Sequence, residues 1–293
     1  MSSAPEISII LVNYNDKPHL TACLESLQKA TANLPAEVLL VDNHSEDGSL
    51  ELIREAFPWV RLFVNDQNLG YAKANNIGIR ASRGAFVLFL NTDTVIPPDA
   101  LVLLVGELRR QPQAAAIGPA LVRADSSYQV SFGRDLGVFG EFRQKFFLNP
   151  YYKFALRHSR KARRVGWLSG ACLHARRDAV VAAGLFDESF FIYFEDIDLC
   201  RRLRDQGFDL FYYPAVHVLH FGGATTASRR WRSRLHYRRS QLRYYEKHGS
   251  RLSLRLLRIF IGLQLAALRL LRVRTPEDRG LFDDLRAGLR GGR

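Results

Sequence analysis

Short apolar runs alternate with longer helix-like stretches over residues 7–110, and few architectures accommodate such an order. The apolar runs span residues 7–13, 37–43, 59–65 and 84–91, and the helix-like stretches lie near residues 17–30, 48–56, 71–81 and 98–110. Runs that are apolar at nearly every position are typical of strands buried on both faces, and their alternation with helices indicates a mostly parallel sheet covered on both sides. We therefore expect an α/β fold.

A polar cluster follows each of the four apolar runs. In chain order the clusters read NYND, DNHSEDGS, NDQNLG and NTDT. Because the carboxyl ends of parallel strands meet at one edge of a sheet, where open α/β folds bind their ligands, the clusters are expected to lie together. This repeated placement is stronger evidence for a ligand site than any single cluster.

The second cluster has two interpretations. Ser45, Asp47 and Gly48 suit a turn followed by a helix cap. That interpretation does not explain Asp42 and Asn43 at the strand end, where a carboxylate can accept a hydrogen bond from a nucleobase. We interpret Asp42 and Asn43 as nucleotide contacts.

Asparagines also mark the third helix-like stretch. Asn68 and Gly70 open it, and Asn75 and Asn76 lie inside it, where asparagine is unfavourable. These residues either cap neighbouring strands, or Asn68, Gly70 and Asn75 lie near the phosphates or ribose of a ligand. The residues themselves leave both interpretations open.

The fourth cluster suits a divalent cation. Asn91 and Asp93 occupy alternate positions at the strand end, so both side chains can point the same way. A Mg²⁺ or Mn²⁺ ion that bridges phosphates needs about one or two protein carboxylates, because substrate and water supply its other ligands. Asp93 suits this role. His217 and His220 follow a later apolar run; each by itself is more often a packed histidine than a ligand, but His220 can complete a metal site.

Residues 190–207, FFIYFEDIDLCRRLRDQG, place aromatic side chains before three acids. The spacing of the leucines and the final glycine predict a helix over about residues 195–206. The helix dipole alone accounts for Glu195 and Asp198 in the first turn. The preceding aromatic residues can in addition restrict water and raise the pKa of a carboxylate, which would suit a general base.

Two segments depart from the α/β pattern. Residues 123–165 are rich in basic and aromatic residues, and we expect a surface excursion that is partly helical. Residues 228–274 contain thirteen arginines, one lysine and one glutamate, which equals the whole net charge of +13. Within them, residues 251–274 suit a helix lying in a membrane interface, or a helix packed on the domain with its arginines in solvent.

Targeting signals are weak. The N-terminal apolar run has no basic residues before it and is expected to be a strand, not a signal peptide. No uncharged apolar stretch is long enough to span a bilayer. The three cysteines show no disulfide framework or zinc-like spacing, which favours a reducing cytosol.

Taken together, the ordered motifs VNYN, VDNHSEDGS, NLGYAKANNIGI, LNTDT, GLFDESFFIYFEDIDLCRRLRDQG and HVLH resemble the family 2 glycosyltransferases of the GT-A fold. The similarity covers about residues 6–223 and is strongest to rhamnosyltransferase-like bacterial members that build cell-surface polysaccharide. It implies a Rossmann-like glycosyltransferase domain over residues 1–227, with the excursion 123–165 inserted, and a basic helical segment over residues 228–293.

The resemblance also implies roles for individual residues. Asp196 matches the catalytic base, and Asp93 matches the last acid of a metal-binding Asp-x-Asp whose first position here is Asn91. His220 matches a histidine that joins the metal in some members. The donor nucleotide and sugar and the acceptor would be contacted by a larger set: Asn13, Asp42, Asn43, Ser45, Asn68, Gly70, Asn75, Asn91, Trp167, Ser169, Gly170 and Glu195.

The implied reaction is an inverting transfer from a dTDP- or UDP-sugar to a hydroxyl of a lipid-linked glycan, assisted by Mg²⁺ or Mn²⁺. The expected location is the cytoplasm, bound peripherally to the inner face of the cell membrane. Two alternatives stay open: a nucleic-acid-binding protein that uses the basic segment, and a non-catalytic protein that binds sugar nucleotides. No recognised nucleic-acid motif accompanies the basic segment, and the presence of both Asp93 and Asp196 argues against the second alternative.

Overall fold

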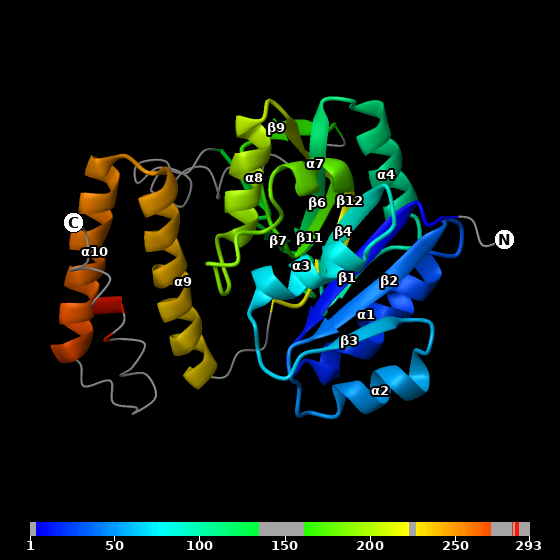
Figure 1. Cartoon of the computed structure of the whole chain (residues 1–293), viewed down its shortest axis with the longest axis horizontal. Coiled ribbons are helices and arrows are strands. Elements are labelled where there is room, and N and C mark those ends of the chain that lie inside the picture. Colours follow the sequence, from blue (N-terminus) through cyan, green and yellow to red (C-terminus); the bar gives the residue numbers. More distant parts are fainter. Residues whose placement is uncertain (1–3, 135–160, 223–226, 271–282, 284, 287–293) are drawn as a thin grey trace.

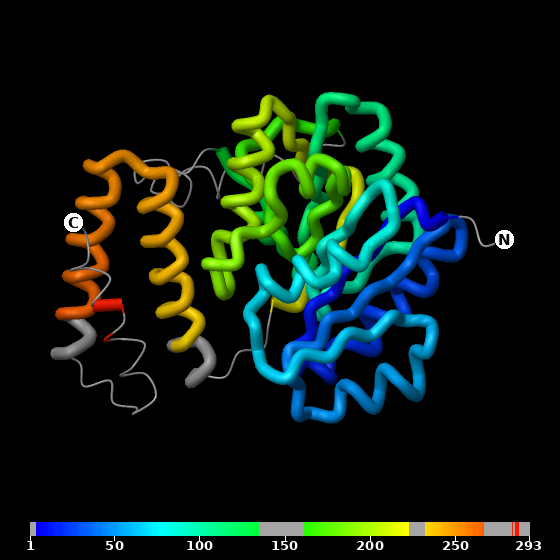
Figure 2. The backbone as a smooth tube through the Cα atoms, viewed as in Figure 1, coloured from blue at the N-terminus to red at the C-terminus, as the bar shows by residue number. Residues whose placement is uncertain are grey.

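A computed structural model describes residues 4–134, 161–222, 227–270, 283, 285 and 286 (Figures 1 and 2). Its first half has the expected alternation. The strands are β1 (Ile7–Asn13), β2 (Ala36–Asp42), β3 (Arg61–Val64) and β4 (Phe86–Asn91), and the helices are α1 (Lys17–Ala30), α2 (Ser49–Ala56), α3 (Tyr71–Ala81) and α4 (Ala100–Arg110). The four strands pair in parallel in the order β3-β2-β1-β4, which confirms the α/β class.

The second half extends the same sheet beyond β4 with both strand directions. Its long strands are β6 (Ala114–Val122), β11 (Cys172–Arg176) and β12 (Asp209–His220), and its short ones are β5 (Thr94–Val95), β7 (Tyr128–Gln129) and β9 (Arg163–Val165). Two further short strands, β8 (Phe132–Gly133) and β10 (Trp167–Leu168), pair with each other in a separate two-stranded sheet. β11 is antiparallel to β4 and β6, whereas β12 is parallel to β6. The sheet is therefore mixed, and it is parallel in the part that precedes the candidate site.

Helices cover both faces of the sheet, as the continuous apolar strands predict. In β1, Ile7, Ile9 and Leu11 point into one core with α1, α2 and α4. Ile10 points into a second core with α3 and with two later helices, α7 (Arg177–Ala182) and α8 (Glu195–Asp205). Alternate side chains of a strand face opposite sides of the sheet, so a strand buried on both faces must be apolar throughout.

Two long helices, α9 (Ala227–His248) and α10 (Arg251–Leu270), form a further layer beside α8 (Figure 1). A third apolar core joins this layer to the domain, with Phe190 and Phe194 packed among residues of α9 and α10. The fully buried Asp198 accepts from Lys247 Nζ at 2.8 Å and lies 2.7 Å from His248 Nε2. The C-terminal helices therefore dock onto the domain through the aromatic stretch before α8 and through Asp198.

The described ends of the basic excursion are strands, not helices. β7 pairs with β6, and β9 pairs with β12. The expected helical part falls on residues 135–160, which lie outside the described residues. Within the described residues, no helix combines the length and the apolar character that crossing a membrane requires.

Candidate active site

Asn13 and Asp42 end neighbouring parallel strands and lie side by side in the register of β1 and β2. Asn13 Nδ2 donates to Asp42 Oδ1 at 2.8 Å and to Ser45 Oγ at 3.0 Å. The backbone N–H of Ser45 donates to the other Asp42 oxygen at 2.8 Å. The three residues thus form one buried network at the carboxyl edge of the sheet, where the sequence predicted a nucleotide contact.

The same network extends to the start of α3. Asn43 Nδ2 donates to the Gly70 carbonyl oxygen at 3.1 Å, and Asn68 Oδ1 accepts from the Gly70 N–H at 2.9 Å. Gly70 has φ +82°, and a Cβ there would lie 2.4 Å from the carbonyl oxygen of Phe191. Only glycine fits this close approach, which brings α3 against the segment before α8.

The two asparagines inside α3 have different environments. Asn76 is used by the loop after α7, since its side chain bonds to both the N–H and the carbonyl of Phe186. Asn75 donates to the Tyr71 carbonyl at 2.9 Å, but its buried Oδ1 accepts no hydrogen bond within the described part of the chain. The structural interpretation therefore explains Asn76 and leaves one polar atom of Asn75 unexplained.

Asp93 and His220 meet where β4 and β12 end. Asp93 Oδ1 lies 3.2 Å from His220 Nε2, and Asn91 Nδ2 lies 3.4 Å from the same nitrogen. On its other side, His220 Nδ1 lies 2.7 Å from Gln129 Oε1, an acceptor, so Nδ1 carries the proton and donates. Nε2 therefore faces Asp93 Oδ1, where a ring without a proton on Nε2 offers its lone pair to a cation.

These residues fit a divalent cation. A histidine that binds a metal usually donates its second ring nitrogen to a neighbouring acceptor, and His220 does so to Gln129. Among the described residues, no group of three or more His, Cys, Asp or Glu side chains gathers as metal ligands. Two protein ligands suffice for Mg²⁺ or Mn²⁺ when substrate phosphates and water provide the rest.

Asp196 begins α8 and faces the segment that contains Gly170. The Gly170 N–H donates to Asp196 Oδ2 at 2.7 Å, and the Ile197 N–H donates to Oδ1 at 2.8 Å. Tyr71 OH donates to the Gly170 carbonyl at 3.0 Å. The carboxylate is therefore held in one orientation by backbone donors, and α3 holds the peptide that contacts it.

The adjacent acids have different protonation preferences. Burial, followed by the charge of Asp196, raises the pKa of Glu195 well above its usual range, and Glu195 Oε2 has no partner among the described residues. Burial also raises the pKa of Asp196, but the N–H groups of Gly170 and Ile197 oppose that rise. The backbone donors that contact Asp196 therefore favour its ionised form, whereas Glu195 Oε2 has no such donor among the described residues.

Trp167 and Ser169 lie on the segment that leads to Gly170. The Trp167 Nε1 is buried beside Gly133 and has no hydrogen-bond partner within the described residues. Ser169 Oγ accepts from the Ala171 N–H at 3.3 Å. Among the described contacts, neither side chain bonds to the Asp196 or Asp93 clusters, so their expected role toward sugar or acceptor stays a prediction.

The sequence did not reveal three positions that organise the site. Gln129 orients His220 from within the predicted excursion, where no local pattern marks it. Tyr71 was inside a recognised motif, but its contacts with Gly170 and Phe191 depend on tertiary structure. Asp198 looked like a helix-dipole acid and is instead an anchor for α9.

The aromatic residues before α8 pack largely against the C-terminal helices. Phe190 and Phe194 are buried against α9 and α10, and Tyr193 contacts Tyr237 of α9. Phe191 is the most exposed of them and stacks on His236 of α9. Most of this stretch therefore packs against the C-terminal helices, and its expected effect on the Asp196 carboxylate stays a prediction.

Comparison with known proteins identifies a glycosyltransferase family and rhamnosyltransferase relatives. The family described as Glycosyl transferase family 2 matches residues 8–180. The chain is 35% identical over 242 residues to the N-acetylglucosaminyl-diphospho-decaprenol L-rhamnosyltransferase of Mycobacterium tuberculosis, covering 75% of this chain and 77% of that protein. It is 24% identical over 224 residues to the rhamnosyltransferase WbbL of Escherichia coli (strain K12), covering 73% and 83%.

Solved structures agree on the fold. The mannosyltransferase PcManGT from Pyrobaculum calidifontis, in complex with GDP-Man and Mn²⁺, superposes with a TM-score of 0.61 at 17% identity. The alignment covers 97% of this chain and 80% of that one. GalNAc-T7, with UDP, GalNAc and Mn²⁺, gives a TM-score of 0.58 at 17% identity, covering 82% of this chain and 48% of that one.

Proposed function

Since the chain belongs to glycosyl transferase family 2, has the GT-A fold and is a rhamnosyltransferase-like glycosyltransferase, we propose that it performs an inverting transfer of rhamnose. The donor is a nucleoside-diphosphate sugar, dTDP- or UDP-linked, and the acceptor is a hydroxyl of a lipid-linked glycan. The names of the relatives support rhamnose and a lipid diphosphate, because one of them is an N-acetylglucosaminyl-diphospho-decaprenol L-rhamnosyltransferase.

The observation that supports this mechanism best is the placement of the Asp196 carboxylate by two backbone N–H groups. The alcohol pKa of an acceptor lies far above neutrality, so a positioned carboxylate has to take the proton as the oxygen attacks the anomeric carbon. The N–H groups of Gly170 and Ile197 hold the Asp196 carboxylate in place and favour its ionised form. With a single base, one displacement inverts the anomeric carbon, and no covalent sugar–enzyme intermediate is needed.

Asn13, Asp42, Asn43 and Ser45 are proposed to hold the nucleoside, and Asn68, Gly70 and Asn75 to line the donor pocket. Asp93 and His220 would hold Mg²⁺ or Mn²⁺ beside the donor diphosphate. A bound cation of this kind offsets the negative charge that gathers on the leaving nucleoside diphosphate. The chain's own part is to fix the two ligands, with Gln129 orienting the histidine.

The proposed reaction predicts one product from a defined panel. The full chain is incubated with UDP- and dTDP-linked sugars, including rhamnose, and with a short-chain prenyl-diphospho-N-acetylglucosamine acceptor. We expect transfer from the rhamnosyl donor, with the anomeric configuration inverted in the product as determined by NMR. Retained configuration would contradict the single-displacement mechanism, and transfer only from a different sugar would contradict the assignment of rhamnose.

A lipid-linked acceptor requires access to a membrane surface, and α10 has a face suited to it. Leu252, Ile259 and Leu263 are 63%, 61% and 66% exposed, and Leu256 and Phe260 continue the same stripe. Arg251 and Arg255 are exposed beside it. The opposite face of α10, which includes Leu257 and Ile261, packs in the third core. The helix thus combines the two sequence interpretations, packing on the domain and lying in a membrane. One face packs in the third core, and the other is proposed to lie in an anionic membrane interface at the inner face of the cell membrane.

Vesicle binding tests this face directly. We expect the full chain to co-sediment with vesicles that contain anionic lipid. Ile259→Glu combined with Leu263→Glu should lower the bound fraction by about 10-fold or more, because two charges replace apolar side chains that would be buried in the lipid interface. Val102→Glu is the matched control, since Val102 is 44% exposed on α4. If the double variant binds vesicles as well as the original chain, or if the original chain does not bind, this surface is not a membrane contact.

A further inference from the structure

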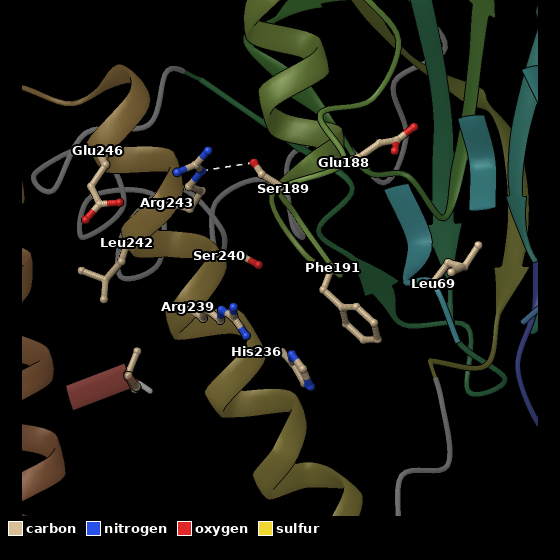
Figure 3. Close-up of a pocket in the computed structure, with 11 residues that line it drawn as sticks. Leu69, Glu188, Ser189, Phe191, His236, Arg239, Ser240, Leu242, Arg243 and Glu246 are labelled. Carbon is tan, nitrogen blue, oxygen red and sulfur yellow. Dashed lines mark hydrogen bonds between the residues drawn. The ribbon is translucent and has the colours of Figure 1, made fainter. Parts of the chain in front are cut away.

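A cavity of about 810 Å³ lies between α9 and the segment before α8 (Figure 3). None of the residues that line it is among the donor or metal candidates. Its lining includes Leu69 and Phe191 on the domain side and His236, Arg239, Ser240 and Arg243 on α9. A volume of this size is typical of sites that bind small molecules, which run from about 300 to 1,000 Å³.

The described residues that line the cavity carry unneutralised positive charge. His236, Arg239 and Arg243 are spaced by three and four residues, so one face of α9 presents them together. Arg239 forms no hydrogen bond or ion pair with any described residue. Arg243 donates through Nε to Ser189 Oγ at 3.1 Å, and its terminal nitrogens have no partner within the described part of the chain.

The two acids at the cavity do not cancel this charge, because each is paired. Glu188 Oε1 accepts from Asn76 Nδ2 at 3.0 Å and from Arg80 at 3.1 Å. Glu246 pairs with Arg258 at 3.0 Å. Among the described residues that line the cavity, the remaining charge is therefore that of the arginines, and an anion is the ligand that complements it.

His236 lies in the same positively charged surroundings. Its ring stacks on Phe191 with the centroids 5.0 Å apart. Burial lowers the pKa of His236, and the charges of Arg239 and Arg232 lower it further. An anion in the cavity would relieve this repulsion between like charges.

The cavity adjoins the proposed catalytic base through a short chain of contacts. The Phe191 carbonyl accepts from the Tyr71 N–H at 2.6 Å, and Tyr71 OH donates to the Gly170 carbonyl at 3.0 Å. Gly170 in turn donates to Asp196 at 2.7 Å. On the other side, Leu69 lies between Asn68 and Gly70 of the proposed donor pocket. An anion held by α9 is thus next to the site and separate from the donor and metal residues.

We propose that this cavity binds the diphosphate of the lipid-linked acceptor, with Arg239 and Arg243 on the phosphate oxygens. The arginine fork matches phosphate geometry, and the apolar side chains of Leu69, Phe191 and Leu242 accommodate the first part of the lipid chain. This inference rests on the proposed function, because it takes a lipid diphosphate as the acceptor. It adds the part of the chain that recognises the diphosphate.

Binding of farnesyl diphosphate to the full chain, measured by calorimetry without vesicles or donor, tests the proposal. We expect Arg239→Gln and Arg243→Gln each to weaken binding by about 10-fold, the loss of one charge-assisted hydrogen bond, and the double variant to weaken it further. Arg234→Gln is the matched control, because Arg234 is exposed on α9 and does not line the cavity. The original chain should bind farnesyl monophosphate more weakly, and UDP and dTDP binding should be unchanged in every variant.

Three results would overturn the proposal. The first is a double variant that binds farnesyl diphosphate like the original chain. The second is an Arg234→Gln variant that loses as much affinity, which would indicate non-specific charge attraction. The third is a double variant that loses binding to anionic vesicles and keeps the soluble ligand, which would assign the arginines to lipid headgroups. If the ligand binds as expected and the original chain transfers no sugar, the proposed function fails and the diphosphate site stands.

Discussion

Replacing Asp196 with Asn is expected to lower the rate of sugar transfer by about 10²–10⁴-fold while donor binding stays unchanged. Asparagine has nearly the same shape, and its side-chain oxygen can still accept from the Gly170 N–H that holds Asp196 Oδ2. The amide cannot take a proton from the acceptor hydroxyl, so the loss falls on kcat. The measurement is steady-state transfer together with the Kd of the sugar nucleotide.

Asp205→Asn provides the control, since Asp205 is an exposed acid on the same helix that pairs with Arg201. The pH profile gives an independent readout. Burial raises the pKa of Asp196, so the base is protonated, and transfer is lost, on acidification at a higher pH than for an ordinary carboxylate. Near-normal turnover in Asp196→Asn would assign the base to another residue, and an unchanged pH profile in that variant would do the same.

The bounds of helices and the polar ends of strands could be predicted, because both depend on residues that are close together in the sequence. The helices at residues 17–30 and 71–81 begin and end as predicted, and the polar ends of β1 and β2 meet because parallel pairing places Asn13 beside Asp42. Strand periodicity cannot give direction across a long connection. The antiparallel insertion of β11 between β4 and β6 therefore became visible only in the structure.

The parts of the site that depend on distant contacts could not be predicted. Gln129 and His220 are 91 positions apart, and their contact exists because β7 lies along β6, which pairs with β12. The acids at 195 and 198 looked equivalent as first-turn residues. The tertiary structure gives the two acids different surroundings. Asp198 has partners on α9, whereas Glu195 Oε2 has none among the described residues.

Replacing Asp93 with Asn is expected to lower transfer by about 10²-fold or more, because a divalent cation contributes several kcal/mol of charge stabilisation that two ligands hold in place. The amide keeps the shape and removes the charge that attracts Mg²⁺ or Mn²⁺. Chelation of the original chain should have the same effect and be reversed by added Mn²⁺. Asp125→Asn is the control, since Asp125 is an exposed acid on the loop before β7.

Two further variants separate a metal role from a purely structural one. Gln129→Ala leaves both proposed ligands in place and removes the acceptor that orients His220, so Mn²⁺ affinity, read by electron paramagnetic resonance without substrate, should fall by about 10–100-fold. Asn91→Asp adds a second acid near His220 Nε2 and should raise that affinity. If Asp93 and Gln129 served only to stabilise the fold, Asp93→Asn and Gln129→Ala would lower the melting temperature. In that case Asn91→Asp would leave the Mn²⁺ affinity unchanged. Transfer that persists unchanged under chelation would show that the Asp93–His220 pair works without a cation.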